Sequence, residues 1–242
     1  MHNPLIDESH IPNYHFFMLT ALLKTMRPKQ WAKNVFLFVA IIFDRKLTNL
    51  PAFLHLLAGF MVFSLLASVV YIINDIADVE ADRQHPKKCK RPIAAGKLSI
   101  PAAWASAIII LLVALPAAYM LSPNFAAIGI FYLLLNLTYS KWIKHIVLLD
   151  IIVLASFYVI RVAAGVALIE VERFSPWLYI FTTFLALLIG AGKRRAELGL
   201  LAEGNNAHRR VLDGYTLEFL DQLIPLESGM TIITYSLYTF SA

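Results

Sequence analysis

The sequence predicts an all-α integral membrane protein with about seven transmembrane helices. The chain has 242 residues, of which 59% are hydrophobic and only 15% are charged, whereas a soluble domain has about 25% charged residues. The apolar residues occur in long blocks, which is typical of membrane-spanning segments. The single cysteine, Cys89, excludes an intrachain disulfide, and its basic surroundings favour the reducing cytosol.

Seven apolar spans follow one another along the chain. Their approximate bounds are 31–43, 52–73, 101–121, 125–138, 146–169, 176–191 and 223–240. The first and fourth are shorter than the roughly 20 residues that a bilayer requires. Segment 16–30 is predicted to form an interfacial helix on the membrane surface. Only 79–100 and 192–215 are long enough to be functional loops, so we expect one helical domain over residues 1–242.

The distribution of basic residues predicts the orientation of these spans. The segment up to Lys33, the two long loops and the connection after the fourth span hold 17 of the 21 Lys and Arg residues. The alternate loops hold only Arg45, Lys46 and Arg173. Positive residues collect on the cytoplasmic side, so we expect the N-terminus and the functional loops to face the cytoplasm from the inner membrane. The net charge of +5 therefore reports topology, and no nucleic-acid partner is expected.

An acidic motif marks the end of the second span. Asn74, Asp78 and Asp82 are spaced i, i+4, i+8, so on one helix they share a face, and Asp75 lies beside it. Carboxylates clustered in this way repel one another unless a cation lies between them, and oxygen ligands suit Mg²⁺. The alternative is a solvated helix end without function.

The loop that follows this motif is rich in basic residues, which include Lys87, Lys88, Lys90 and Arg91. Because Pro92 stiffens the backbone beside it, Arg91 is the strongest candidate for a functional role. The alternative is that this loop only obeys the positive-inside rule.

A charge within the fifth span is a further candidate. Arg161 has apolar neighbours on both sides, and a charge at this depth indicates function by default. Asp150 lies eleven residues earlier on nearly the same face, about 16 Å away, so the two do not pair directly. We expect both to line one polar cavity. The alternative is a structural ion pair between Arg161 and another helix.

Several strings resemble a known family. The motif NDIADVEAD fits the NDxxDxxxD pattern of the UbiA superfamily of intramembrane prenyltransferases. RPKQWAKN (27–34), DVEADRQHPKKCKRPIAAG (78–96) and AGKRRAEL (191–198) resemble its decaprenyl-phosphate phosphoribosyltransferase branch. The resemblance implies nine helices around a central cavity, Mg²⁺ on the aspartates and a pyrophosphate leaving group. Since the chain ends straight after the seventh span, we expect the last two helices of the family to be missing.

Aromatic prenyltransferases of the superfamily carry a second aspartate-rich motif in the later cytoplasmic loop. Here that loop has one acid, Glu197, among Lys193, Arg194 and Arg195. A basic patch that binds another phosphate is better supported than a second metal clamp, and the alternative is a solvated basic helix end. Tyr139 and Lys144 lie in a region that the resemblance assigns to the cavity mouth, although both are also common as interface anchors.

These observations together predict a Mg²⁺-dependent transferase. It moves a 5-phosphoribosyl group from phosphoribosyl pyrophosphate to a polyprenyl phosphate. The predicted metal ligands are Asn74, Asp75, Asp78 and Asp82, of which the three aspartates are also the predicted catalytic residues. The predicted phosphate-binding residues are Lys33, Lys87, Lys88, Arg91, Tyr139, Lys144, Arg161, Lys193 and Arg194, and Asp150 and Glu197 complete the site. Two alternatives remain: a prenyltransferase that uses a prenyl diphosphate, and a membrane transporter of anionic solutes. The sequence leaves the oligomeric state unknown.

Overall fold

The computed structural model describes residues 14–169, 171, 175–202 and 210–241, and within these ranges it contains helices and no strand. In chain order the elements are α1 (Tyr14–Met26), the 3-10 helix η2 (Pro28–Phe38), α2 (Val39–Phe43), α3 (Leu50–Ala77), α4 (Val79–Gln84), η3 (Lys88–Lys90), α5 (Ile100–Leu121), α6 (Pro123–Lys141), η4 (Ile143–His145), α7 (Leu149–Val166), α8 (Pro176–Ala202), η5 (Arg210–Gly214) and α9 (Leu217–Ser241). The predicted all-α class is confirmed.

Three of the long helices begin with the same local signal. Asn49, Ser99 and Ser122 are the N-cap residues of α3, α5 and α6, and each side chain accepts a hydrogen bond from a backbone N–H of the first turn. A proline follows within the first two helical positions of each. This combination satisfies a free N–H and presets the backbone for a helix, which explains why the three helices start there.

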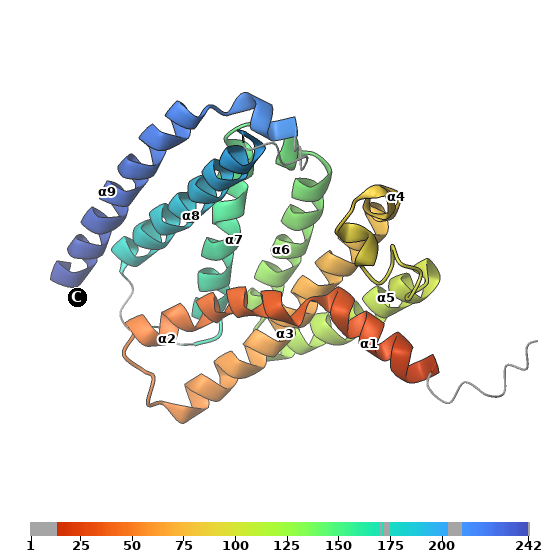
Figure 1. Ribbon diagram of the computed structural model, residues 1–242. Helices are drawn as coiled ribbons and strands as arrows, with labels where there is room; N and C mark the ends of the chain where they lie inside the picture. The colour runs from red at the N-terminus through yellow and green to blue at the C-terminus, as the bar shows by residue number, and fades with distance from the viewer. Residues whose placement is uncertain (1–13, 170, 172–174, 203–209, 242) are drawn as a thin grey trace, which may run out of the picture.

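The helices form one bundle in which the start of the chain crosses α3 (Figure 1). The elements α1, η2 and α2 form a continuous arm that crosses α3, and η2 also packs against α7. On the other side, α5 packs against α3, and α6 contacts α3, α5 and α7. The pair α8 and α9 completes the bundle beside α7. The interior is therefore lined by η2, α3, α6 and α7.

A close backbone contact fixes the position of η2 in this bundle. A Cβ atom on Gly165 of α7 would lie 2.0 Å from the carbonyl oxygen of Leu37, so a side chain here would force the two elements apart. The surrounding core includes Phe63 from α3 and Phe125 from α6, both fully buried. A glycine is thus required where η2 meets α7.

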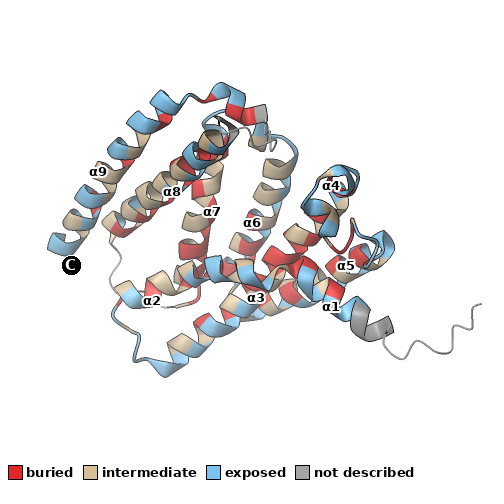
Figure 2. Ribbon diagram, viewed as in Figure 1, coloured by how far each residue is buried: buried red, intermediate tan, exposed pale blue. Residues whose placement is uncertain are grey.

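Four helices are long and apolar enough to cross a membrane, judged over the described residues: α3, α5, α7 and the segment 176–200 of α8. Only 17% of the apolar window of α5 is buried, and large apolar side chains such as Leu112 and Val113 are exposed on it. Figure 2 shows the same division, with buried residues on the facing sides of the helices. The chain is an integral multi-pass membrane protein, but the predicted count of seven spans is not confirmed.

The first predicted span differs from expectation in its helix type. It comprises η2 followed by α2, and a 3-10 helix rises about 2.0 Å per residue against about 1.5 Å in an α-helix. Residues 28–43 therefore extend about 30 Å, which is the thickness of the hydrocarbon core. The predicted span itself, 31–43, extends only about 24 Å by the same rises, so its being short for a bilayer stays a prediction.

Two predicted boundaries also need correction. Segment 16–30 is not one helix, because α1 ends at Met26 and Arg27 has the left-handed dihedrals φ 54° and ψ 62°. At the other end, 192–215 is not a loop from its start, because α8 continues to Ala202. The stretch KRRAEL consists of strong helix formers, which explains the continuation.

Candidate functional site

The acidic motif lies across a break between two helices. Helix α3 ends at Ala77, Asp78 caps it, and α4 begins at Val79. The i→i−4 hydrogen bonds continue on both sides, from Asp78 N to Asn74 O at 2.9 Å and from Asp82 N to Asp78 O at 2.8 Å. The motif is therefore helical on both sides of a single interruption at Asp78, where the sequence predicted one uninterrupted helix.

Of the predicted face, only Asp82 is buried, together with Asp75 beside it. Asp75 and Asp82 are both 2% exposed, whereas Asp78 is exposed and Asn74 is half-buried. Positions seven apart return to the same side of a helix after two turns, which places Asp75 and Asp82 together. Asp78 instead lies at the surface, so the buried acidic pair is Asp75 with Asp82.

Two arginines hold the buried pair. Nη1 of Arg91 lies 3.1 Å from Oδ1 of Asp75 and 2.5 Å from Oδ2 of Asp82. Nη2 of Arg27 lies 2.5 Å from Oδ1 of Asp75, and its guanidinium lies over the ring of Tyr71, 5.0 Å from the centroid. Lys88 is more distant, with Nζ 4.0 Å from Asp82. The two carboxylates are thus compensated by cations from both sides.

The loop that carries Arg91 is anchored by apolar residues. Ile93 and Leu98 are buried with Val79 in the core beneath α3 and α5. The backbone of Pro92 accepts hydrogen bonds from Lys97 and Leu98 at 2.8 and 3.2 Å. This closed turn fixes Arg91 at the end of η3, while Lys87 and Lys88 are exposed.

The donor set can be compared with the needs of Mg²⁺. Within the described residues, no three His, Cys, Asp or Glu side chains lie close enough together to hold a metal ion. However, Mg²⁺ requires only one or two protein carboxylates, since water and substrate phosphates complete its shell. Asp75 and Asp82 converge on one nitrogen atom of Arg91, so they fit this requirement if Arg91 moves aside.

Arg161 lies in the interior, 4% exposed, and its partners are neutral. Its Nε donates to Asn34 Oδ1 at 2.8 Å, its Nη1 to the carbonyl of Phe157 at 2.5 Å, and its Nη2 to the Tyr132 hydroxyl at 3.3 Å. The rings of Phe63, Tyr132 and Tyr158 surround the guanidinium at 5.2–5.9 Å. Among the described residues no carboxylate forms an ion pair with Arg161, so the alternative of an interhelical ion pair finds no support.

Asn34 was missed by the sequence analysis. It is 1% exposed and connects Arg161 to Ser64 of α3, to which its Nδ2 donates at 2.9 Å. In the sequence Asn34 stands within RPKQWAKN, and an amide side chain among polar residues does not indicate that it is buried. The contact depends on η2 packing between α3 and α7.

Asp150 belongs to a different cluster from Arg161. Its Oδ2 lies 2.5 Å from Nε of Arg194, and both side chains are fully buried. Arg194 also contacts Glu197 at 2.6 Å and the Tyr139 hydroxyl at 3.4 Å. The hydroxyl of Tyr215 donates a hydrogen bond to Asp150. Asp150 and Arg161 therefore have separate partners, contrary to the expectation of one shared polar cavity.

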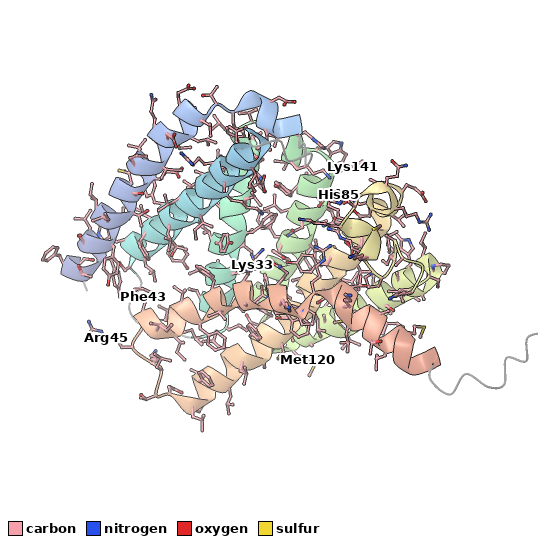
Figure 3. All side chains as sticks on the ribbon, in the orientation of Figure 1. Lys33, Phe43, Arg45, His85, Met120 and Lys141 are labelled. Carbon is pink, nitrogen blue, oxygen red and sulfur yellow. The ribbon has the colours of Figure 1, made fainter. Side chains whose placement is uncertain are left out.

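The remaining candidates lie around these clusters. Lys33 is exposed and lies within electrostatic reach of Arg27, Arg161 and Lys193; in Figure 3 it is on the side of η2 turned toward α7. Lys144 is half-buried in η4. Figure 3 also shows His85 and Lys141 at one end of the molecule and Arg45 at the other. The basic candidates thus come from separate elements, among them η2, η3, η4 and α8.

The family model described as the UbiA prenyltransferase family matches residues 31–192. A decaprenyl-phosphate phosphoribosyltransferase of Mycobacterium tuberculosis (strain CDC 1551 / Oshkosh) is 35% identical over 227 residues, covering 92% of this chain and 75% of that protein. The protein of the same name from Corynebacterium glutamicum is 33% identical over 225 residues, covering 90% and 67%. Among solved structures, a UbiA homolog from Archaeoglobus fulgidus bound to DMAPP and Mg²⁺ superposes with a TM-score of 0.74 at 20% identity, covering 92% and 78%. The chain belongs to the UbiA prenyltransferase family.

Proposed function

We propose that this protein transfers a 5-phosphoribosyl group from phosphoribosyl pyrophosphate to a polyprenyl phosphate and releases pyrophosphate. The observation that carries the proposal is the presence of two separate sites, one formed by acidic residues and one formed by basic residues. Asp75 and Asp82 form a single buried carboxylate pair, whereas the later motif contains Lys193, Arg194 and Arg195 with one acid, Glu197. The acidic site suits a metal-bound diphosphate. Of the later motif, Arg194 and Arg195 are held in ion pairs with acids, so Lys193 with the buried Arg161 is what suits a second phosphate. The names of the relatives agree with this donor and acceptor.

The donor would bind where α3 meets α4. Asp75 and Asp82 would hold Mg²⁺, with Asn74 and Asp78 beside them at the break between the helices. Bound there, Mg²⁺ would neutralise the pyrophosphate as the C1–O bond breaks. Arg91 and Arg27, which now contact the carboxylates, would turn to the pyrophosphate oxygens, because guanidinium groups bind phosphate in a bidentate manner.

The acceptor phosphate would bind near Arg161. This guanidinium has only neutral partners, and a buried cation without a counter-ion favours an anionic ligand. Lys33 and Lys193 add positive charge nearby. The polyprenyl tail would lie along apolar helix faces that are open to the lipid.

The reaction needs no protein base. A phosphomonoester has its second pKa near about 6, so the lipid phosphate is largely doubly ionised at neutral pH. One of its oxygens forms the new bond to C1 while the pyrophosphate oxygen leaves with its electron pair. Positive charge that develops on the ribose ring would be stabilised by the nearby carboxylates. Tyr71, one turn before Asp75 on α3, lies within electrostatic reach of Arg27 and Arg161, so the two sites are adjacent.

We also propose that the site faces the cytoplasm. His85, in the loop that carries Arg91, and Lys141, at the end of α6, lie at the same end of the molecule (Figure 3). Together with the segment up to Lys33 and residues 192–215, this loop and the end of α6 with its connection to α7 hold 17 of the 21 Lys and Arg residues. Positive residues remain on the cytoplasmic side of the membrane, where a soluble pyrophosphate donor is available.

The test is a transfer assay with the purified protein in lipid nanodiscs. Radiolabelled phosphoribosyl pyrophosphate and a polyprenyl phosphate should give labelled lipid and an equal amount of pyrophosphate, and EDTA should abolish both. Dimethylallyl diphosphate in place of the ribosyl donor should give no product. Glu80→Gln is a suitable control, because Glu80 is exposed and pairs only with Arg83. Prenyl transfer without ribosyl transfer would overturn the proposal.

A further inference from the structure

The turn that opens α7 has a strained backbone. Leu148 has φ 67° and ψ −45°, and the N–H of Leu149 donates to the carbonyl of Val147 at 2.9 Å. This i→i+2 hydrogen bond defines a γ-turn of the rare form with positive φ. A leucine adopts such a conformation only where surrounding contacts enforce it.

One tyrosine hydroxyl supplies such a contact. The backbone N–H of Leu148 donates to the hydroxyl of Tyr215 at 2.7 Å, and the same hydroxyl donates to Oδ1 of Asp150. Burial, and next the hydrogen bond to Asp150, raise the pKa of Tyr215 above its usual value, so the hydroxyl keeps its proton at physiological pH. Tyr215 thus joins the strained residue to the buried carboxylate two positions later.

The segment around Tyr215 closes on the same turn through packing. A Cβ on Gly214 would lie 2.2 Å from Cγ2 of Val147, so a side chain at position 214 would force Val147 to shift. Tyr215 is also buried in one apolar cluster with Ile151, Val211 and Leu220. The chain between α8 and α9 is therefore docked on the start of α7 at two consecutive residues.

This contact fixes the positions of two groups of candidate phosphate-binding residues. On one side, Asp150 pairs with Arg194, and Arg194 reaches the hydroxyl of Tyr139; Lys193 precedes Arg194 on α8. On the other side, η4, which carries Lys144, ends at His145, just before the turn. The direction of η4 relative to α7 depends on the backbone of Leu148.

We infer that Tyr215 is a positioning residue for the transfer reaction. By holding the Leu148 turn and Asp150 at once, its hydroxyl sets the relative positions of Lys144, Tyr139 and Arg194. The inference rests on the proposed function only in that Lys144 and Lys193 would bind substrate phosphate, while Arg194 stays in its ion pair with Asp150. Tyr215 itself need not touch a substrate.

Tyr215→Phe tests this inference, because it removes the hydroxyl and little else. We expect kcat/KM to fall about tenfold, since one buried hydrogen bond to a charged group is lost, mainly through a higher KM or Kd for polyprenyl phosphate. We also expect the amide of Leu148 to lose protection from hydrogen exchange. Tyr235→Phe on α9 is the matched control, because Tyr235 is 48% exposed, and it should change neither quantity.

Leu148→Gly provides the rescue. Glycine adopts positive φ without strain, and Leu148 is 46% exposed, so little packing is lost. In the Tyr215→Phe background, this change should restore kcat/KM to within about threefold of Leu148→Gly alone. A purely structural tyrosine would lower the melting temperature and leave the kinetics unchanged.

Unchanged kinetics in Tyr215→Phe, or no rescue by Leu148→Gly, would overturn the inference. If Tyr215→Phe fails to insert, the exchange rate of the Leu148 amide in the unaltered protein is the test. Slow exchange supports the contact with Tyr215, and exchange at the rate of a free amide overturns it. If the unaltered protein transfers no ribosyl group, the proposed function fails. The role of Tyr215 is then still tested by hydrogen exchange of the Leu148 amide and by the Kd of Tyr215→Phe for polyprenyl phosphate.

Discussion

Asp75 and Asp82 lie two helical turns apart, on opposite sides of the break at Asp78, and both carboxylates contact Nη1 of Arg91 at 3.1 and 2.5 Å. A single cationic atom thus occupies the point where the two acids converge. Mg²⁺ would compete for the same point, so binding of the metal and movement of Arg91 are coupled in the proposed reaction.

Arg91→Lys should raise the KM for phosphoribosyl pyrophosphate about tenfold and leave the fold intact. Lysine keeps the charge that compensates the buried acids, but its ammonium cannot bind a phosphate in the bidentate manner of a guanidinium. Steady-state kinetics with each substrate varied in turn measures the effect. Arg83→Lys is the matched control, since Arg83 is an exposed neighbour that pairs with Glu80. An unaltered KM for the donor would exclude Arg91 from its binding.

Asn34→Asp should weaken binding of polyprenyl phosphate by about tenfold or more. The change is nearly isosteric, yet it puts a counter-charge beside Nε of Arg161, where two charges interact by several kcal/mol (about 4 kcal/mol at 4 Å in a medium of intermediate polarity). Arg161→Leu should have the same effect and still insert, because the removed charge is costly in a membrane. The affinity for polyprenyl phosphate, compared with that for the uncharged polyprenol, is the readout.

Asn49→Asp is the control for this experiment. Asn49 caps α3 at an exposed position, where aspartate serves equally well, and its substitution should leave both affinities unchanged. Equal affinity of Asn34→Asp and the unaltered protein for polyprenyl phosphate would show that Arg161 does not hold the acceptor.

Arg194→Met should lower the free energy of unfolding by about 3–5 kcal/mol, because it leaves the carboxylate of Asp150 buried and unpaired. Arg195→Met removes the neighbouring cation, whose ion pair with Asp221 is half-exposed, and should leave the melting temperature almost unchanged. Thermal unfolding in detergent compares the two variants. Equal melting temperatures would mean that the Asp150–Arg194 pair does not contribute to stability.

The sequence predicted most of the helices and the acidic motif, but not which of its acids are buried or how the polar residues are combined. Hydrophobic blocks and caps are local signals, so α3, α5, α6 and α7 were found near their observed positions. Asp82 and Arg91 are close in sequence and were both candidates, but their ion pair was not predicted. In contrast, Asn34 meets Arg161 across 127 positions, and Tyr215 meets Asp150 across 65. Such pairs depend on helix packing, which periodicity does not encode.

Cys89 provides a test of orientation. It is half-buried in the loop that carries Arg91, so a small membrane-impermeant thiol reagent should label it in inverted vesicles and not in intact cells, following the positive-inside rule. A cysteine introduced at Lys46, between α2 and α3, should show the reverse pattern. Labelling of Cys89 from outside the cell would put the acidic pair on the wrong side for a cytosolic donor.

The Mg²⁺ dependence of Asp75→Asn and Asp82→Asn tests the central claim most directly. Asparagine keeps the shape of aspartate but removes the charge that binds the metal. Each variant should therefore insert normally, lose roughly a hundredfold or more in turnover, and require more Mg²⁺ for its half-maximal rate. Asp78→Asn, at the exposed position between them, should show the same change in Mg²⁺ requirement to a smaller extent. Full turnover with an unchanged Mg²⁺ requirement in Asp75→Asn and Asp82→Asn would contradict a metal site on the buried pair and the proposed transfer reaction with it.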